Sequence, residues 1–333
     1  MSKSRKIVTV LGAGNMGTAL AKIIADNGFK VRLWNYSGDP EPLNQIATQH
    51  ENIKYLPGII LPELITPQSD LTLALDGAGL VIFAVPSAVV CSLFTEVEPH
   101  LISTAVCVDV SKGITTTADH KLVGVAAECL AKWKTVVSVS GPAIAGQMAR
   151  RGFTVMNIAG GDRRSVNQVK QVLENDFLKL VAVKDVKGVE ICGTLKNIYA
   201  IALGILDGLK YPVNTKAALV VAALREMATL LKASGASVKT ASDFAGLGDL
   251  IATGFSAESR NRRLGELLGQ GVDALSAQTE IGQVVEGVTA VKLIRDLALS
   301  HQMELPIVEV VNQVLMAKLA PAEAASRMLN NIC

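Results

Sequence analysis

With 333 residues, half of them hydrophobic and few aromatic, the chain is long enough for two aliphatic cores, and its composition excludes a disordered protein. The formal net charge of +2, with Lys and Arg spread along the chain, gives no indication of a nucleic-acid partner. The five cysteines lack metal-binding spacing, and we expect reduced, buried thiols in a cytoplasmic protein without a metal site. No membrane span is predicted, because the longest apolar run, residues 80–94, is short and contains Pro86.

The chain begins with a predicted strand, a glycine-rich turn and a helix. A β-branched run over residues 6–11 is followed by Gly12-Ala13-Gly14-Asn15-Met16-Gly17 and then by helical spacing. In a dinucleotide-binding turn Gly12 permits the tight turn, Gly14 lets a pyrophosphate approach, and Gly17 lets the helix pack on the strand. The free amides at the helix start suit phosphates. We therefore predict a nicotinamide or flavin nucleotide; a glycine turn without a ligand is the alternative.

The second predicted strand, residues 31–34, bears on the choice of nucleotide. An NAD-preferring site usually places Asp or Glu at the end of this strand, on the ribose 2′-hydroxyl. Here Asn35, Tyr36 and Ser37 follow the strand, and the first acid is Asp39. This order favours NADP, or dual use of NADP and NAD, over strict use of NAD. Arg32 is a candidate partner for a 2′-phosphate, with a solvated strand residue as the alternative.

The remaining pattern indicates two domains. Apolar runs predict strands at residues 80–85, 105–110, 135–139, 153–159 and 180–183, a helix over 163–178 and an irregular, proline-rich loop over 55–67. Most of these strands end in small-residue turns, which line the ligand crevice of an open parallel sheet. After about residue 189 helical periodicity takes over. We predict an α/β fold: a Rossmann-like, doubly wound, mostly parallel sheet in residues 1–189, and an all-α substrate domain in residues 190–333.

Residues 188–208 predict an apolar helix with one face of small residues. That face contains Gly193, Asn197, Ala200, Gly204 and Gly208, and we expect the first domain and the substrate to come close to it. Lys196 lies in the middle of this helix. A buried ammonium is costly unless it is paired or used, and a lysine whose stem only covers apolar surface is the alternative.

Three further polar stretches lie in the second half of the chain. They are the glycine loop around Asp249 in residues 245–253, the basic cluster Ser259-Arg260-Asn261-Arg262-Arg263, and residues 283–287 around Glu286. Taken singly, these stretches also fit a turn-forming Asp, a solvated helix start and a helix cap.

Taken together, these motifs resemble the bacterial type of NAD(P)-dependent glycerol-3-phosphate dehydrogenase. The shared pieces follow the family's order over nearly the whole chain, at residues 12–17, 83–87, 111–113, 140–142, 195–197, 245–250, 259–261 and 282–287. Gly-Leu-Gly-Asp-Leu followed by Ser-Arg-Asn is much more specific than the glycine turn. The resemblance implies reversible hydride transfer between NAD(P)H and dihydroxyacetone phosphate, which supplies glycerol 3-phosphate for phospholipid synthesis in the cytoplasm.

The resemblance also assigns roles to matching positions. Lys196 is implied to be the general acid/base at the C2 oxygen, with Asp249 beside it. The other implied substrate positions are Lys112, Gly141, Ala143, Asn197, Thr253, Ser259, Arg260 and Asn261. The implied cofactor positions are Gly12, Gly14, Asn15, Met16, Gly17, Tyr36, Lys112, Ala145, Arg260, Val285 and Glu286.

The chemistry of the residues agrees with these roles. Hydride reduction of a ketone builds negative charge on oxygen, and a positioned ammonium can stabilise that charge and donate the proton. Burial lowers the pKa of a lysine and a neighbouring carboxylate raises it, so the pair of Lys196 and Asp249 can be tuned toward the working pH. An arginine such as Arg260 offers a fork of donors to a phosphate.

Two departures from the family pattern and three open alternatives remain. After Ser-Gly-Pro the family usually has Thr-Phe-Ala-x-Glu, whereas this chain has Ala143-Ile144-Ala145-Gly146-Gln147, so a hydroxyl and a carboxylate are missing. If the Thr hydroxyl holds substrate, affinity is reduced; if backbone amides build that site, activity survives. Met16 replaces a common aromatic residue and is expected to pack against the nicotinamide.

The alternative functions are a 3-hydroxy acid dehydrogenase, a 6-phosphogluconate-type dehydrogenase and a non-catalytic NAD(P)-binding sensor. The apolar C-terminal helices are compatible with a homodimer.

Overall fold

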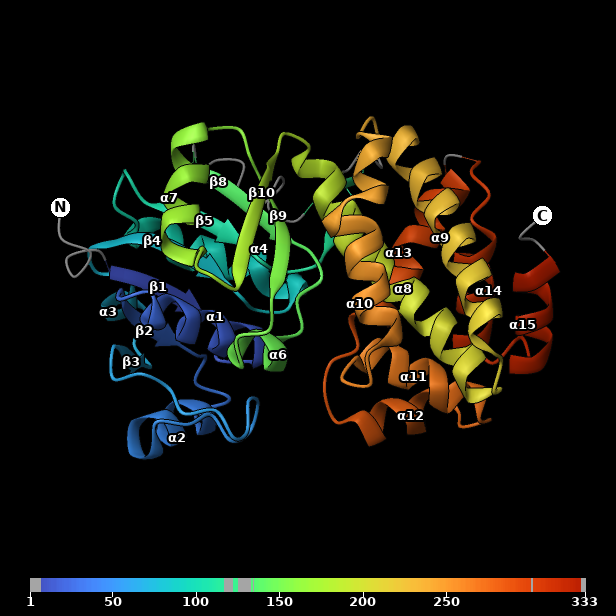
Figure 1. Ribbon diagram of the computed structural model, residues 1–333, viewed down its shortest axis with the longest axis horizontal. Coiled ribbons are helices and arrows are strands. Elements are labelled where there is room, and N and C mark those ends of the chain that lie inside the picture. Colours follow the sequence, from blue (N-terminus) through green and yellow to red (C-terminus); the bar gives the residue numbers. More distant parts are fainter. Residues whose placement is uncertain (1–6, 117–121, 125–132, 134, 301, 331–333) are drawn as a thin grey trace. The chain divides into compact units, whose positions relative to one another are not determined.

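The chain folds into two compact units (Figure 1). The computed structural model describes residues 7–116, 122–124, 133, 135–300 and 302–330. The first unit comprises Met1–Ser111 and Val125–Val186, and the second comprises Lys112–Gly124 and Lys187–Cys333. The division predicted at residue 189 lies inside helix α8 (Val186–Gly208), and the prediction did not place residues 112–124 in the second unit.

An eight-stranded sheet organises the first unit, in the order β10-β9-β8-β5-β4-β1-β2-β3. Its strands are β1 (Ile7–Leu11), β2 (Lys30–Trp34), β3 (Ile65–Gln68), β4 (Ala78–Phe83), β5 (Val106–Asp109), β8 (Val136–Ser140), β9 (Thr154–Gly160) and β10 (Leu178–Val183). Neighbouring strands are parallel except for β8 and β9, which are antiparallel. The predicted mostly parallel, Rossmann-like sheet is confirmed.

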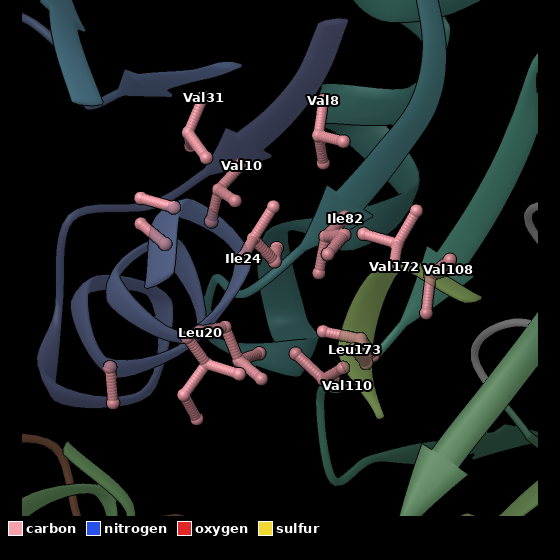
Figure 2. Packing of buried hydrophobic residues seen from close by; sticks show 14 of the residues in the cluster. Val8, Val10, Leu20, Ile24, Val31, Ile82, Val108, Val110, Val172 and Leu173 are labelled. Carbon is pink, nitrogen blue, oxygen red and sulfur yellow. The ribbon is translucent and has the colours of Figure 1, made fainter. Parts of the chain in front are cut away.

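Alternate side chains of the strands enter two separate cores, as a doubly wound sheet requires. Val8 and Val10 of β1 pack in one core with α1 (Asn15–Asp26) and α7 (Arg163–Leu173). Figure 2 shows Ile24 of α1 beside Val10 and Ile82 in this core. Leu11, the next residue of β1 after Val10, enters the other core with α3 (Leu71–Leu75) and α4 (Ser87–Val97). The remaining helices of this unit are α2 (Glu41–Gln49), η2 (Glu98–His100) and α6 (Ala145–Ala149).

Besides the short helices α2, α3, α4 and α6, which were not predicted, three further elements differ from the sequence prediction. Strand β3 lies in the stretch predicted as an irregular loop; it is an edge strand paired only with β2, where the missing N–H of Pro67 is tolerated. The hairpin of β6 (Ile114–Thr116) and β7 (Leu122–Gly124) was not predicted. Helix α7 ends at Leu173 rather than 178, because the chain turns there into β10.

The second unit is helical apart from the β6–β7 hairpin. Its helices are α8, α9 (Val213–Ala233), η3 (Val238–Ser242), η4 (Phe244–Gly248), α10 (Asp249–Phe255), α11 (Arg260–Gly269), α12 (Ala274–Ile281), α13 (Glu286–Ser300), α14 (Pro306–Leu315) and α15 (Pro321–Asn330). Within the described residues, α8 alone is long and apolar enough to cross a membrane, and its most apolar window is entirely buried in the protein. Such burial is typical of a core helix.

The small-residue face of α8 packs against α11 within the second unit. A Cβ on Gly204 would overlap the carbonyl oxygen of Arg262, and one on Gly208 would overlap that of Glu266. A Cβ on Gly265 of α11 would in turn overlap the backbone of α8. The expectation that Gly204 and Gly208 face the first domain and the substrate is therefore wrong. These glycines let two helices of the same unit approach closely.

The cysteines follow the sequence prediction only in part. Cys107 and Cys192 are buried and are not in a disulfide, and burial raises the pKa of Cys107 to about 12. Cys91 is disulfide-bonded, so the prediction of reduced thiols is wrong for this residue. Cys129 and Cys333 lie outside the described residues.

Candidate active site

The turn between β1 and α1 has the backbone that the glycine spacing predicts. Gly12 has a φ of +106°, and a Cβ on it would lie 2.6 Å from the carbonyl oxygen of Ala84. A Cβ on Gly17 would overlap the carbonyl oxygen of Gly12. Gly14, in contrast, has nothing within 4 Å of its missing Cβ among the described residues. Packing therefore requires glycine at positions 12 and 17. Gly14 instead leaves open space beside the backbone amides that begin α1.

Two buried asparagines hold this turn in place. Asn35 accepts a hydrogen bond from the Ala13 amide at 3.1 Å, and the fully buried Asn52 donates to the Ala13 carbonyl at 2.8 Å. Asn52 also donates to the Thr18 hydroxyl at 2.7 Å. The sequence analysis missed Asn52, because a lone asparagine in a loop has no periodic signal before its partners are known.

The other cofactor positions predicted in the first unit have contrasting surroundings. Asn15 is exposed at the start of α1, and Met16 is partly buried against the core. Tyr36 is 58% exposed after the end of β2. Arg32, the candidate 2′-phosphate partner, instead donates to the carbonyl oxygens of Ala74 and Asp76 at 3.4 and 2.5 Å. Arg32 therefore contacts the end of α3 through Nη1, and its assignment to a 2′-phosphate stays a prediction.

The carboxyl ends of β5 and β8 carry polar groups that a ligand could satisfy. The buried hydroxyls of Ser111 and Ser140 have no hydrogen-bond partner among the described residues. Beside them, a Cβ on Gly141 would lie 2.7 Å from the Cα of Met156, while Ala143 and Ala145 are partly buried against the core. Strand ends of this kind, together with the glycine turn, fit a dinucleotide.

The second unit brings two lysines onto one buried carboxylate. Asp249, at the start of α10, is 1% exposed, and its Oδ2 lies 2.7 Å from Nζ of Lys112. Its Oδ1 lies 3.3 Å from Nζ of Lys196 on α8. Thr253, one turn further along α10, accepts from Lys196 at 2.6 Å and donates to Asp249 at 3.1 Å. The α10 helix thus fixes both partners of Lys196.

The two lysines differ in their proton affinity. Burial lowers the pKa of Lys196 to about 7, against the opposing pull of Asp249, and the charge of Lys112 lowers it further. Burial also lowers the pKa of Lys112, but the ion pair with Asp249 outweighs burial and raises it above its ordinary value. At neutral pH Lys112 therefore holds its proton, whereas Lys196 changes charge in this range.

A second polar group joins α8, α11 and α13. Asn197 accepts from the Asn261 side chain at 2.9 Å and donates to Glu286 at 3.4 Å. Asn261 accepts in turn from the Gly287 amide at 2.9 Å. Val285 is buried just before α13. These contacts fix both asparagines next to the lysine cluster along α8.

The basic cluster at the start of α11 separates into one unpaired and two paired arginines. Arg262 pairs with Asp207 at 2.7 Å, and Arg263 pairs with Glu280 at 2.8 Å. Arg260 is exposed and has no ionic or hydrogen-bonding partner within the described part of the chain. It lines a surface hollow with Ser259, whose hydroxyl caps α11 by accepting from the Arg262 amide. This end of α11 combines an unpaired cation with a helix N-terminus, groups suited to an anion, although Glu258 and Glu280 also line the hollow.

The predicted site residues therefore form two groups. The first unit contains Gly12, Gly14, Asn15, Met16, Gly17, Tyr36, Gly141, Ala143 and Ala145, and the second contains Lys112, Lys196, Asn197, Asp249, Thr253, Ser259, Arg260, Asn261, Val285 and Glu286. Across the described residues, no group of three or more His, Cys, Asp or Glu side chains could hold a metal.

Comparisons with known proteins cover nearly the whole chain. The family descriptions NAD-dependent glycerol-3-phosphate dehydrogenase N-terminus and C-terminus match residues 7–166 and 185–326. A glycerol-3-phosphate dehydrogenase (NAD(P)+) of Geobacillus thermodenitrificans is 39% identical over 97% of this chain and 94% of the relative. That of Shewanella pealeana is 37% identical over 98% and 96%. The crystal structure of glycerol-3-phosphate dehydrogenase from Coxiella burnetii matches with a TM-score of 0.90 at 33% identity, covering 97% of this chain and 98% of that one.

Proposed function

The chain belongs to the NAD-dependent glycerol-3-phosphate dehydrogenase family, and from that premise we propose the roles its residues take in exchanging a hydride between NAD(P)H and dihydroxyacetone phosphate. When bound, the reduced nicotinamide supplies the hydride to the C2 carbon of the ketone. The chain's own residues then have three tasks: to hold the nucleotide, to bind the substrate phosphate and to move one proton at the C2 oxygen.

Lys196 carries the proton in this proposal. Hydride addition leaves negative charge on the C2 oxygen, and the Lys196 ammonium stabilises that charge and donates its proton. In the reverse direction the neutral amine accepts the hydroxyl proton. Its pKa of about 7 supports the proposal, because both forms are populated at neutral pH.

Asp249, Thr253 and Lys112 prepare Lys196 for this task. Asp249 and Thr253 hold the Nζ atom of Lys196 in one position. Lys112 keeps its proton and so keeps Asp249 paired whatever the charge of Lys196. The buried carboxylate therefore always has one cationic partner, and Lys196 can gain or lose a proton without leaving a buried charge unpaired.

Arg260 and the start of α11 bind the substrate phosphate in this proposal. Arg260 offers donors that no other described side chain occupies, and Ser259 adds a hydroxyl beside the helix amides. Asn261 and Asn197 are instead positioning residues, because their side-chain oxygens already accept hydrogen bonds within the protein. Binding energy from the phosphate can orient the reacting carbon.

The first unit holds the nucleotide in this proposal. The amides after Gly14 suit the pyrophosphate, and Met16 offers an apolar surface to the nicotinamide. The orphaned hydroxyls of Ser111 and Ser140 are further candidates for contact with the nucleotide.

The single observation that carries the proposal is the Lys112–Asp249–Lys196 cluster, in which one buried carboxylate holds two ammonium groups of opposite pKa shift. The test is the loss of reduced nicotinamide absorbance when purified protein is mixed with dihydroxyacetone phosphate and either NADH or NADPH. Formation of glycerol 3-phosphate in equal amount is the expected result. Absence of turnover with both nucleotides would refute the proposed reaction.

We also propose that the protein works in the cytoplasm, where it supplies glycerol 3-phosphate for phospholipid synthesis, and that it forms a homodimer. The exposed valines Val213 and Val221 of α9, eight residues apart on one helix face, support an apolar contact between copies. Light scattering of the protein, with Val221→Lys as the comparison, tests the dimer; a monomeric wild type would refute it. Cell fractionation tests the location, and recovery outside the cytoplasm would refute it.

A further inference from the structure

The segment after β2, residues 35–41, is where a Rossmann fold meets the adenosine ribose of a dinucleotide. Asn35 occupies the position at which an acid usually binds the 2′-hydroxyl. Its side-chain oxygen accepts from the Ala13 amide, and its amide donates to the Asp39 carbonyl at 2.7 Å. Asn35 therefore serves the glycine turn, and the choice between NAD and NADP depends on the charges that follow it.

Asp39 is the first acid of this segment, and it is held inside the protein. Only 8% of it is exposed. Its Oδ1 accepts from Nζ of Lys54 at 2.8 Å, and its Oδ2 accepts from the Tyr55 hydroxyl at 2.8 Å. Lys54 also pairs with Glu41 at 3.1 Å. Lys54 is thus shared between two carboxylates.

A closed series of hydrogen bonds fixes this arrangement. Asn35 joins the glycine turn to Asp39, and Asp39 joins Tyr55. The Tyr55 amide donates to Asn52 at 3.2 Å, and Asn52 returns to the glycine turn through the Ala13 carbonyl. Lys54 lies between Asn52 and Tyr55 in the chain, so its backbone is held near Asp39, within reach of both carboxylates.

The charges near the end of β2 add up to a negative sum. Asp39, Glu41 and Asp70, which caps α3 after the neighbouring strand β3, are three negative charges against the two positive charges of Lys54 and Arg32. In the described residues from 35 to 55, the only other side chain that can become cationic is His50, at the far end of α2. Arg32 donates through Nη1 to the carbonyl oxygens of Ala74 and Asp76, and it keeps its positive charge. Even with Arg32 counted, the sum of these charges is negative, and a 2′-phosphate with nearly two negative charges would be repelled.

We propose that this chain binds NAD(H) in preference to NADP(H), and that Asp39 sets this preference by holding Lys54 in an ion pair. The inference rests on the proposed function, in which the nucleotide carries the hydride. It runs opposite to the sequence expectation, which considered only the missing acid after β2. The structure adds that Lys54, the lysine that follows this segment in the chain, is already paired with Asp39 and Glu41. Repulsion of the 2′-phosphate then decides the preference.

Direct binding tests the inference without turnover. The dissociation constants of NADH and NADPH are measured by quenching of protein fluorescence, without substrate, for the wild type and three variants. Asp39→Asn removes the charge that neutralises Lys54, Lys54→Met removes the cation, and Glu63→Gln removes an exposed carboxylate near the opposite end of the edge strand β3. Damage to the glycine turn would weaken the binding of both nucleotides alike. The ratio of the NADPH dissociation constant to the NADH dissociation constant therefore reports only the preference between them.

The wild type is expected to bind NADH about tenfold more tightly than NADPH, with the difference shrinking as salt screens the charges. Asp39→Asn should lower the ratio about three- to tenfold, Lys54→Met should raise it, and Glu63→Gln should leave it unchanged. A wild type that binds NADPH as tightly as NADH, or an unchanged ratio in Asp39→Asn, would overturn the inference. Turnover with NADPH as the preferred nucleotide would overturn the inference and leave the proposed reaction standing. Selective binding of NADH without any turnover would support the inference and overturn the proposed reaction.

Discussion

Replacing Lys112 by methionine changes the pH dependence of the reaction in a predictable direction. The variant keeps an unbranched apolar side chain and loses the ammonium that shares Asp249 with Lys196. Because Lys112 lowers the pKa of Lys196, its removal raises that pKa. Ketone reduction requires protonated Lys196, so its rate falls as the pH rises through this pKa. The falling limb of kcat for reduction should therefore move to higher pH in Lys112→Met.

The size of the shift follows from the geometry of the cluster. The two ammonium groups lie 2.7 and 3.3 Å from the two oxygens of one buried carboxylate. Like charges about 4 to 8 Å apart, at an effective dielectric constant of about 20, repel by about 2–4 kcal/mol. One pKa unit corresponds to about 1.4 kcal/mol, so we expect the limb to move by roughly one to three pH units.

The assay measures initial rates at saturating dihydroxyacetone phosphate and NADH over a series of pH values at which circular dichroism shows a folded protein. Asp249→Asn is the matched comparison, because Asp249 raises the pKa of Lys196 and its loss should move the same limb to lower pH. General damage to the site would lower kcat in both variants, but it would not shift the falling limbs of their two pH profiles in opposite directions. Limbs that stay in place, or that move in the same direction, would refute the proposed tuning of Lys196.

The remaining predictions concern single residues. Lys196→Ala should lower kcat by about 10²- to 10⁴-fold and leave NADH binding largely intact; a near-normal rate would contradict the acid/base role. Arg260→Ala should raise the KM for dihydroxyacetone phosphate by about 10- to 100-fold, while Arg295→Ala, whose ion pair with Glu309 lies outside that hollow, changes it little; equal effects would count against the phosphate assignment. Burial raises the pKa of Glu226 from 4.5 to about 7, so the stability that its protonated form contributes is fully present below pH 4.5 and is lost as the pH rises through 7. Urea unfolding above pH 7 should therefore show Glu226→Gln to be about 2–4 kcal/mol more stable than the wild type, and equal pH dependence of the two proteins would refute this. Gly204→Ala should lower the free energy of unfolding by about 1–3 kcal/mol because the new Cβ meets the backbone of α11. Gly161→Ala, with open space around it, should cost less, and equal losses would contradict the packing argument.

The sequence predicted the elements that bury continuous apolar runs. Strands such as β1 and β4, and the switch to helices after residue 189, follow from local composition. It missed β3, because a proline at a sheet edge looks the same in sequence as a proline in a loop. The partner of the glycine face of α8 could not be predicted either. Residues 204 and 265 lie far apart in the chain, and spacing alone does not say which surface a small-residue face meets.

The candidate site was predictable in its residue types and less so in its connections. Lys196 was singled out as a buried cation in an apolar helix, and resemblance to the family supplied Asp249 and Arg260. Neither source indicated that Lys112 and Lys196 share one carboxylate, because that contact joins segments 137 residues apart in the chain. The same holds for Asp39 and Lys54, whose pairing depends on how the loop after α2 returns to the end of β2.

The proton affinity of Lys196 is the quantity on which the proposed mechanism depends. It can be measured directly by NMR titration of side-chain lysine resonances in isotopically labelled protein, with Lys196→Arg to assign the signal. The structure predicts a midpoint near pH 7, because burial removes the ammonium from water and Lys112 repels it. A midpoint at the ordinary lysine value of 10.5 would contradict the assignment of Lys196 as the residue that exchanges the proton.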